Sequence, residues 1–168
     1  MFWYYFYNLT TMPGVMVHEL SHAFFCVFSG VKIHKMKLFQ MDSTVAGYVV
    51  HDEPQKFWQG FFITLGPLII NSALATFLFS LVVAPWARWQ PWVVLWLAIA
   101  IGLHAIPSTG DAQSLFQLTN HRFWHNPLVI VAYPFVLVLY ILNLLKRLKI
   151  DFVFVGLLYW LGRWYLKG

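Results

Sequence analysis

A chain of 168 residues that is 60% hydrophobic, 20% aromatic and only 10% charged is too apolar for a soluble domain of this size. Its net charge of +5 comes from lysines and arginines in the expected loops and tails, which favours contact with anionic lipid over a nucleic-acid-binding surface. The single cysteine, Cys26, excludes an internal disulfide bond and a cysteine-rich zinc site. The composition therefore predicts a protein of the lipid bilayer that does not bind nucleic acid.

The first apolar segment, residues 12–28, predicts a membrane-spanning helix. Thr11 stands where an N-cap residue is favoured, Pro13 suits the first helical turn, and Gly30 is expected to end the helix. The preceding residues 2–11 are rich in aromatic side chains, which are common at membrane–water interfaces. Together the two stretches are long enough to cross a bilayer.

A His-Glu-x-x-His motif occupies positions 18–22 of this helix. Residues four apart share one helix face, so His18 and His22 can bind one zinc ion, and Glu19 can act as general base on water at that ion. A structural histidine pair is the alternative, but charged side chains at membrane depth cost about 2.5–3.5 kcal/mol and are usually functional. Cys26, one turn beyond His22, either packs in the core or adds a ligand.

A polar loop follows at residues 31–56. Within it, β-prone residues 45–50 surround Gly47 and predict one or two short strands. An extended strand edge beside an active site can bind an unfolded peptide by strand addition.

Four more apolar segments complete the chain, at residues 57–84, 92–106, 127–145 and 150–166. With the first helix they predict an all-α membrane protein of about five transmembrane helices, with a short β-hairpin-like loop after the first. Pro134 is expected to kink the fourth span. No linker or repeat divides the chain, so residues 1–168 are expected to form a single integral-membrane domain.

The second of these spans contains Gly66-Pro67 and, one turn later, Asn71. Pro67 has no N–H and therefore frees a backbone carbonyl, while Gly66 permits close approach of another helix. The amide of Asn71 either joins helices by hydrogen bonds or acts in the site.

The third span ends at His104 and is followed by Pro107, Ser108 and Asp111. No other carboxylate lies between Glu53 and Asp151. The Ser-x-x-Asp spacing is that of a helix capping box, and a helix N-terminus can also present a carboxylate to a metal ion. Asp111 is therefore expected to cap a helix, to bind a metal, or both.

A second His-x-x-x-His pair, His121 and His125, lies in a polar stretch beside aromatic residues and is interpreted as interfacial. Two such pairs raise the alternative of a membrane di-iron desaturase or hydroxylase. Those sites need about eight histidines with adjacent His-His pairs, whereas this chain has seven histidines and no adjacent pair.

The ordered set of motifs resembles the site-2 protease family of intramembrane zinc metalloproteases, over a core of about residues 12–115; the additional helices at 124–166 carry no family motif. The resemblance implies zinc ligands at His18, His22 and Asp111 and a water-activating base at Glu19. It also implies that Asn71 helps to bind substrate or the oxyanion. The family's third-ligand motif usually reads Asn-x-x-Pro-x-x-x-x-Asp-Gly; here His104 replaces the Asn and is expected near the zinc ligands without binding the metal.

The expected function is that of an intramembrane endopeptidase with one Zn²⁺ per chain, acting on a transmembrane protein or peptide. The alternative is a metal-binding membrane protein without proteolytic activity, such as a transporter or a degenerate protease scaffold, which has no need of Glu19. Basic residues place the loop 31–56 in the cytoplasm, so the site of this multi-pass protein is expected nearer the cytoplasmic side. With this orientation the basic run 146–149 lies on the outer side of the membrane, contrary to the rule that basic residues favour the cytoplasmic side.

Overall fold

The computed structural model describes residues 2–41, 45–82, 88–122, 124 and 127–165. These residues form seven α-helices, one short 3₁₀-helix and two strands. In chain order the elements are α1 (Phe2–Thr10), α2 (Met12–Phe28), β1 (Ile33–Lys37), β2 (Tyr48–His51), α3 (Phe57–Leu81), α4 (Gln90–Leu103), α5 (Thr109–Arg122), α6 (Pro127–Leu145), η1 (Lys146–Leu148) and α7 (Ile150–Tyr165).

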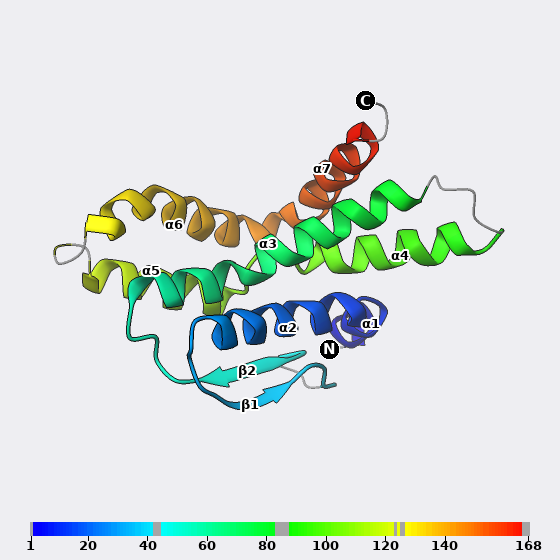
Figure 1. Cartoon of the computed structure of the whole chain (residues 1–168). Helices are drawn as coiled ribbons and strands as arrows, with labels where there is room; N and C mark the ends of the chain where they lie inside the picture. The colour runs from blue at the N-terminus through cyan, green and yellow to red at the C-terminus, as the bar shows by residue number, and fades with distance from the viewer. Residues whose placement is uncertain (1, 42–44, 83–87, 123, 125–126, 166–168) are drawn as a thin grey trace.

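The long helix α3 is the element on which the others pack, because it contributes to all three apolar clusters of the described residues. Its Phe79 packs with α4 and α7, its Phe57 with α5 and α6, and its Ile63 with Cys26 of α2. Figure 1 shows α3 crossing the molecule between α2 on one side and α6 and α7 on the other. Cys26 is fully buried in this packing, which favours the core role over a ligand role.

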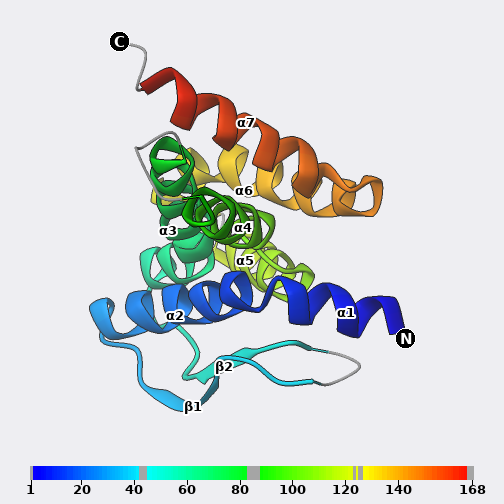
Figure 2. The same cartoon turned by 90° about the vertical axis from the view of Figure 1, so that its right-hand side faces the viewer.

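The first two helices meet at Thr11, and Figure 2 shows α1 extending from the start of α2 toward the N-terminus. Thr11 occupies the N-cap position and Pro13 the first turn, as predicted, but the Thr11 side chain makes no capping hydrogen bond. Its hydroxyl instead donates to the Tyr7 carbonyl at 2.8 Å. At the other end α2 stops at Phe28, and Gly30 reverses the chain with a φ of 70°, a conformation that glycine adopts without a steric penalty.

The predicted strand character after α2 is confirmed as a two-stranded antiparallel sheet, in which Met36 pairs with Val49 and Lys37 with Tyr48. Strand β2 begins directly after Gly47, within the stretch that the sequence indicates. The sequence does not indicate where the partner strand of the expected hairpin lies, because β1 carries three residues with long polar side chains, His34, Lys35 and Lys37. Both figures show the sheet on the side of α2 that faces away from α3 and α4.

The described chain is mostly helical, as predicted. About five transmembrane helices were predicted, whereas two of the described helices, α3 and α6, are long and apolar enough by length and composition to cross a membrane. Helix α4 is apolar but has 14 residues, and α2 and α7 have 17 and 16. The second and third predicted spans, residues 57–84 and 92–106, end earlier in the structure, at Leu81 and Leu103. Pro134 lies within α6, which is continuous from Pro127 to Leu145.

Candidate metal centre

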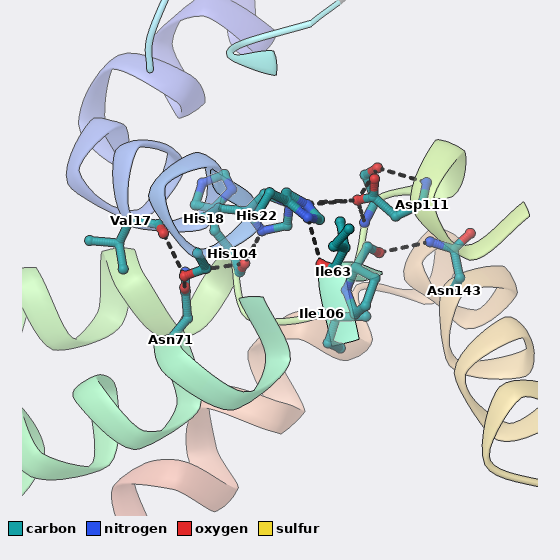
Figure 3. A network of polar contacts seen from close by, with 12 residues as sticks. Val17, His18, His22, Ile63, Asn71, His104, Ile106, Asp111 and Asn143 are labelled. Carbon is teal, nitrogen blue, oxygen red and sulfur yellow. Dashed lines mark hydrogen bonds and ion pairs between the residues drawn. The ribbon is translucent and has the colours of Figure 1, made fainter. Parts of the chain in front are cut away.

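Three side chains from two distant helices converge at one point beside α3 (Figure 3). His18 and His22 come from α2 and Asp111 from the first turn of α5. The Nε2 atoms of the two histidines are 3.2 Å apart, and the Asp111 Oδ2 atom lies 3.7 Å from that of His18 and 3.3 Å from that of His22. The motif at 18–22 and the later aspartate are thus brought together as the sequence predicts.

The spacing of these atoms suits a tetrahedral metal site. Ligand atoms about 2.0–2.1 Å from a zinc ion lie about 3.3–3.4 Å from one another in that geometry. The three distances between the His18, His22 and Asp111 atoms, 3.2, 3.3 and 3.7 Å, are close to this value. Two imidazoles and one carboxylate are also a ligand set that zinc accepts in catalytic sites.

The protonation of both histidines follows from their other ring nitrogen. The Nδ1 atom of His18 lies 2.6 Å from the His104 carbonyl oxygen, and that of His22 lies 2.8 Å from the Ile63 carbonyl oxygen. A carbonyl only accepts, so each Nδ1 carries a proton and donates it, which leaves each Nε2 atom to bind either a metal ion or a second proton. Two lone pairs and a carboxylate then face one another, an arrangement that is unfavourable unless a cation or a proton lies between them.

Each of these two carbonyls lacks a normal helical partner. The Ile63 carbonyl would accept from the N–H of residue 67, but Pro67 has none, so the carbonyl is free for His22. The His104 carbonyl lies just past the last residue of α4, where helix carbonyls are unpaired. The sequence predicts that Pro67 frees a carbonyl, and the structure places His22 on it. Gly66 lies directly against the Ser21 carbonyl and the Phe25 ring of α2, as its close approach requires.

Asp111 belongs to a capping box and to the cluster at once. Its Oδ2 atom accepts from the Ser108 N–H at 2.9 Å and the Ser108 hydroxyl at 2.6 Å, and its own N–H donates to the Ser108 Oγ atom at 3.2 Å. Burial acts to raise the pKa of the Asp111 carboxyl, but the neighbouring His22 and His18 outweigh it and hold that pKa well below its usual range. The carboxylate is therefore ionised and fixed in direction, as a metal ligand must be.

Glu19 lies beside the cluster and lines the same cavity, which has a volume of about 1680 Å³. Its side chain is buried, yet within the described part of the chain its carboxylate makes no hydrogen bond or ion pair. The segment before β2 packs closely on it: a Cβ at Gly47 would lie 2.7 Å from the Glu19 Cγ atom. Only glycine fits here without displacing Glu19 or the chain segment that lies over it.

Asn71 does not line this cavity; it is fully buried where α2, α3 and α4 meet. Its amide donates to the carbonyls of His104 and Ile101, both at 3.3 Å, and of Gly14 at 3.4 Å. The Ser21 hydroxyl donates to its Oδ1 atom at 3.2 Å. Asn71 therefore joins the three helices, which is one of its two predicted roles. Its link to the metal-ligand cluster is indirect, because Asn71 and His18 donate to the same His104 carbonyl.

His104 takes part in the site through its backbone. Its carbonyl accepts from His18, while its ring Nε2–H donates to the Thr11 hydroxyl at 2.8 Å, and the ring is outside the ligand cluster. Of the second histidine pair, His121 lines the cavity and His125 lies outside the described residues. The carbonyl of Ile63 has no signal in its own residue type; the only indication in the sequence is the proline four residues later.

A comparison with models of protein families identifies the family of the chain. The model of the DUF3267 family, whose description reads "Putative zincin peptidase", matches residues 11–122, which include both histidines, Glu19 and Asp111. No curated protein matches the chain. No solved structure matches it either.

Replacing Pro67 tests the contribution of the free carbonyl. In Pro67→Ala the new N–H competes with His22 for the Ile63 oxygen, and removing such an orienting partner typically lowers metal affinity about 10–100-fold. We expect a loss near the lower limit, measured by competition with a chromophoric chelator. Pro134→Ala, at the other proline inside a helix, is the matched control and should bind zinc normally. Equal affinities of the two variants would contradict this role.

Asp111→Asn separates capping from metal binding. Asparagine is also a favourable capping residue, whereas Asp111→Ala removes the cap as well, at a cost of about 1 kcal/mol of stability. If Asp111 is a ligand, both variants should lose most of their bound zinc. When all three proteins are measured without zinc, only the alanine variant should unfold at a lower temperature than wild type. Full zinc occupancy in the asparagine variant would reduce Asp111 to a cap.

Proposed function

Because the chain belongs to the zincin peptidase family, we propose that it is a zinc-dependent endopeptidase that hydrolyses peptide bonds of membrane-embedded substrates. One Zn²⁺ per chain would be bound by His18, His22 and Asp111, with Glu19 as the general base. The observation that carries the proposal is the convergence of three ligand atoms within 4.8 Å of one another, next to a carboxylate that lines the cavity.

Three protein ligands would leave a zinc ion one position for water or substrate, as in catalytic sites. When bound, zinc supplies a Lewis acid that polarises a peptide carbonyl and activates water near neutral pH. Glu19 accepts a proton from the attacking water and returns it to the leaving amine. Its place one residue after His18 on a packed helix fixes its position relative to the ligands, and its carboxylate has no cation partner among the described residues that would occupy it.

The alternative of a metal-binding membrane protein without proteolysis is less well supported. A transport or structural site has no use for a carboxylate that lines the cavity beside the ligands but is not one of them. Glu19 is such a carboxylate, and the bare backbone of Gly47 leaves room for it. The family description supports peptide hydrolysis as well.

The membrane setting is supported by the outward faces of the helices. Apolar side chains on α6 and α7 are exposed rather than packed, with Val131 at 72%, Phe135 at 65% and Val153 at 71% exposure. Large apolar side chains exposed one turn apart on the same helix, such as Val131 and Phe135, indicate contact with lipid or another apolar partner. We place α3 and α6 across the bilayer, with α1 and α2 together as a further span and α4 and α7 as shorter ones. The basic residues of the loop at 31–56 favour an orientation with the site nearer the cytoplasm.

A substrate can reach the site as an added strand. The segment 45–49 and His51 line the cavity, so one edge of β2 faces it, while β1 pairs with the other. No third strand covers that edge among the described residues. A substrate helix that unwinds there would gain main-chain hydrogen bonds and bring its carbonyl toward the ligands.

Glu19→Gln tests the base. The variant should keep about one zinc per chain and lose cleavage of single-span peptides reconstituted in liposomes, because an amide cannot accept the proton. Metal analysis and mass spectrometry of the products measure the two effects. A variant that cleaves at the wild-type rate, or that loses its metal, would contradict the assigned role. A zinc-loaded wild type that cleaves no such peptide would favour the non-proteolytic alternative.

Strand addition is tested by changing the substrate rather than the enzyme. A cleavable peptide carrying one N-methyl group at successive positions loses one backbone donor at a time. Because strand residues alternate in hydrogen-bonding direction, we expect cleavage to fall at every second position near the cut. A uniform response along the peptide would exclude pairing with β2.

A further inference from the structure

The turn between α4 and α5 carries two parts of the metal centre. At its start, the His104 carbonyl accepts from His18; at its end, Ser108 holds the carboxylate of Asp111. Between them, Ile106 and Pro107 are almost completely buried. Their carbonyl groups belong to neither helix, so they need donors from elsewhere in the chain.

Both donors come from the C-terminal part of the chain, beyond residue 122 where the family match ends. The Asn143 amide of α6 donates to the Pro107 carbonyl at 3.0 Å, and the Lys146 ammonium of η1 donates to the Ile106 carbonyl at 2.9 Å. Figure 3 shows Asn143 approaching this turn from the side opposite His18 and His22. Asn143 is 7% exposed, so its amide would be left unpaired in the interior without this bond.

We propose that Asn143 and Lys146 are positioning residues for the third zinc ligand, so that the C-terminal helices complete the metal centre. The inference rests on the proposed function in one respect, the ligand role of Asp111. Two adjacent carbonyls fixed by two side chains leave the turn little freedom to rotate. Since Ser108 and Asp111 follow within four residues, the direction of the carboxylate toward His18 and His22 depends on this anchoring.

Lys146 suits this position chemically. Its flexible chain places one ammonium N–H on a backbone oxygen, and the group retains further donors. It is also the one lysine or arginine among the described residues that line the cavity, in which Glu19, Asp52, Glu53 and Asp111 are the carboxylates. Its positive charge therefore helps to balance the acidic lining on the Asp111 side.

The test measures zinc affinity of the full chain by chelator competition, together with thermal unfolding of the zinc-free protein. Asn143→Leu and Lys146→Met each remove one donor and keep much of the side-chain volume. We expect each to weaken zinc binding about tenfold, at the lower end of the 10–100-fold losses that follow removal of a partner of a ligand. Lys146→Arg keeps a donor and should retain most of the affinity. Lys149→Met, an exposed lysine after the same 3₁₀ turn, is the control and should bind normally.

A double-mutant cycle separates positioning from general destabilisation. In an Asp111→Ala background, Asn143→Leu and Lys146→Met should cause no additional loss of zinc affinity, because the ligand on which they act is gone. Additional losses equal to those in the wild-type background would overturn the inference, as would normal zinc affinity in both single variants. If Asp111→Ala itself binds zinc like wild type, the proposed ligand set fails instead, and the two failures are distinguished.

Discussion

The proposed metal centre depends on two backbone carbonyls that have no partner in their own helices. One is released by Pro67, four residues after Ile63, and the other lies beyond the end of α4 at His104. Each accepts from the Nδ1 atom of one histidine, which turns both Nε2 lone pairs toward Asp111. Without these acceptors the imidazole rings could rotate or exchange tautomers, and the ligand atoms would not converge on one point. Interruptions of regular helix structure thus orient the ligands.

The packing of the helices brings these interruptions together. Helix α3 contacts α2, α4, α5 and α7, so the oxygen of Ile63 meets α2 at the level of His22. Asn71, one turn beyond Pro67 on α3, joins this helix to α2 and α4. It donates to the His104 carbonyl, which also accepts from His18. Its three backbone acceptors give this buried amide a complete set of partners, which an apolar interior requires. Stability of the bundle and geometry of the site therefore depend on the same hydrogen bonds.

Much of this arrangement is predictable from the sequence, because the side chains that form it have distinctive chemistry and two of them, His18 and His22, stand at helical spacing. The pair His18 and His22, the neighbouring Glu19 and the distant Asp111 were all identified by residue type, and the sheet by its β-prone residues near Gly47. Two kinds of feature were not. Backbone acceptors such as the carbonyl of Ile63 carry no signature in their own residue, and the mostly polar residues of β1 do not indicate which segment pairs with β2. Asn143 and Lys146 belong to no motif, and only the folded chain places them on the Ile106–Pro107 turn.

The order of the parts along the chain has a consequence for biogenesis. His18 and the carbonyl that orients it are 86 positions apart, and the Asn143 and Lys146 donors lie 36 and 40 positions further along from their own acceptors. A partly synthesised chain therefore has the histidine pair but lacks the geometry that makes it a strong chelator. If zinc binds as proposed, its acquisition would be a late step that follows helix assembly, and the site would be complete only after Asn143 and Lys146 have been made. The bound ion would then act as a cross-link between α2 and α5, and the stabilisation of the folded state would grow with the logarithm of its affinity.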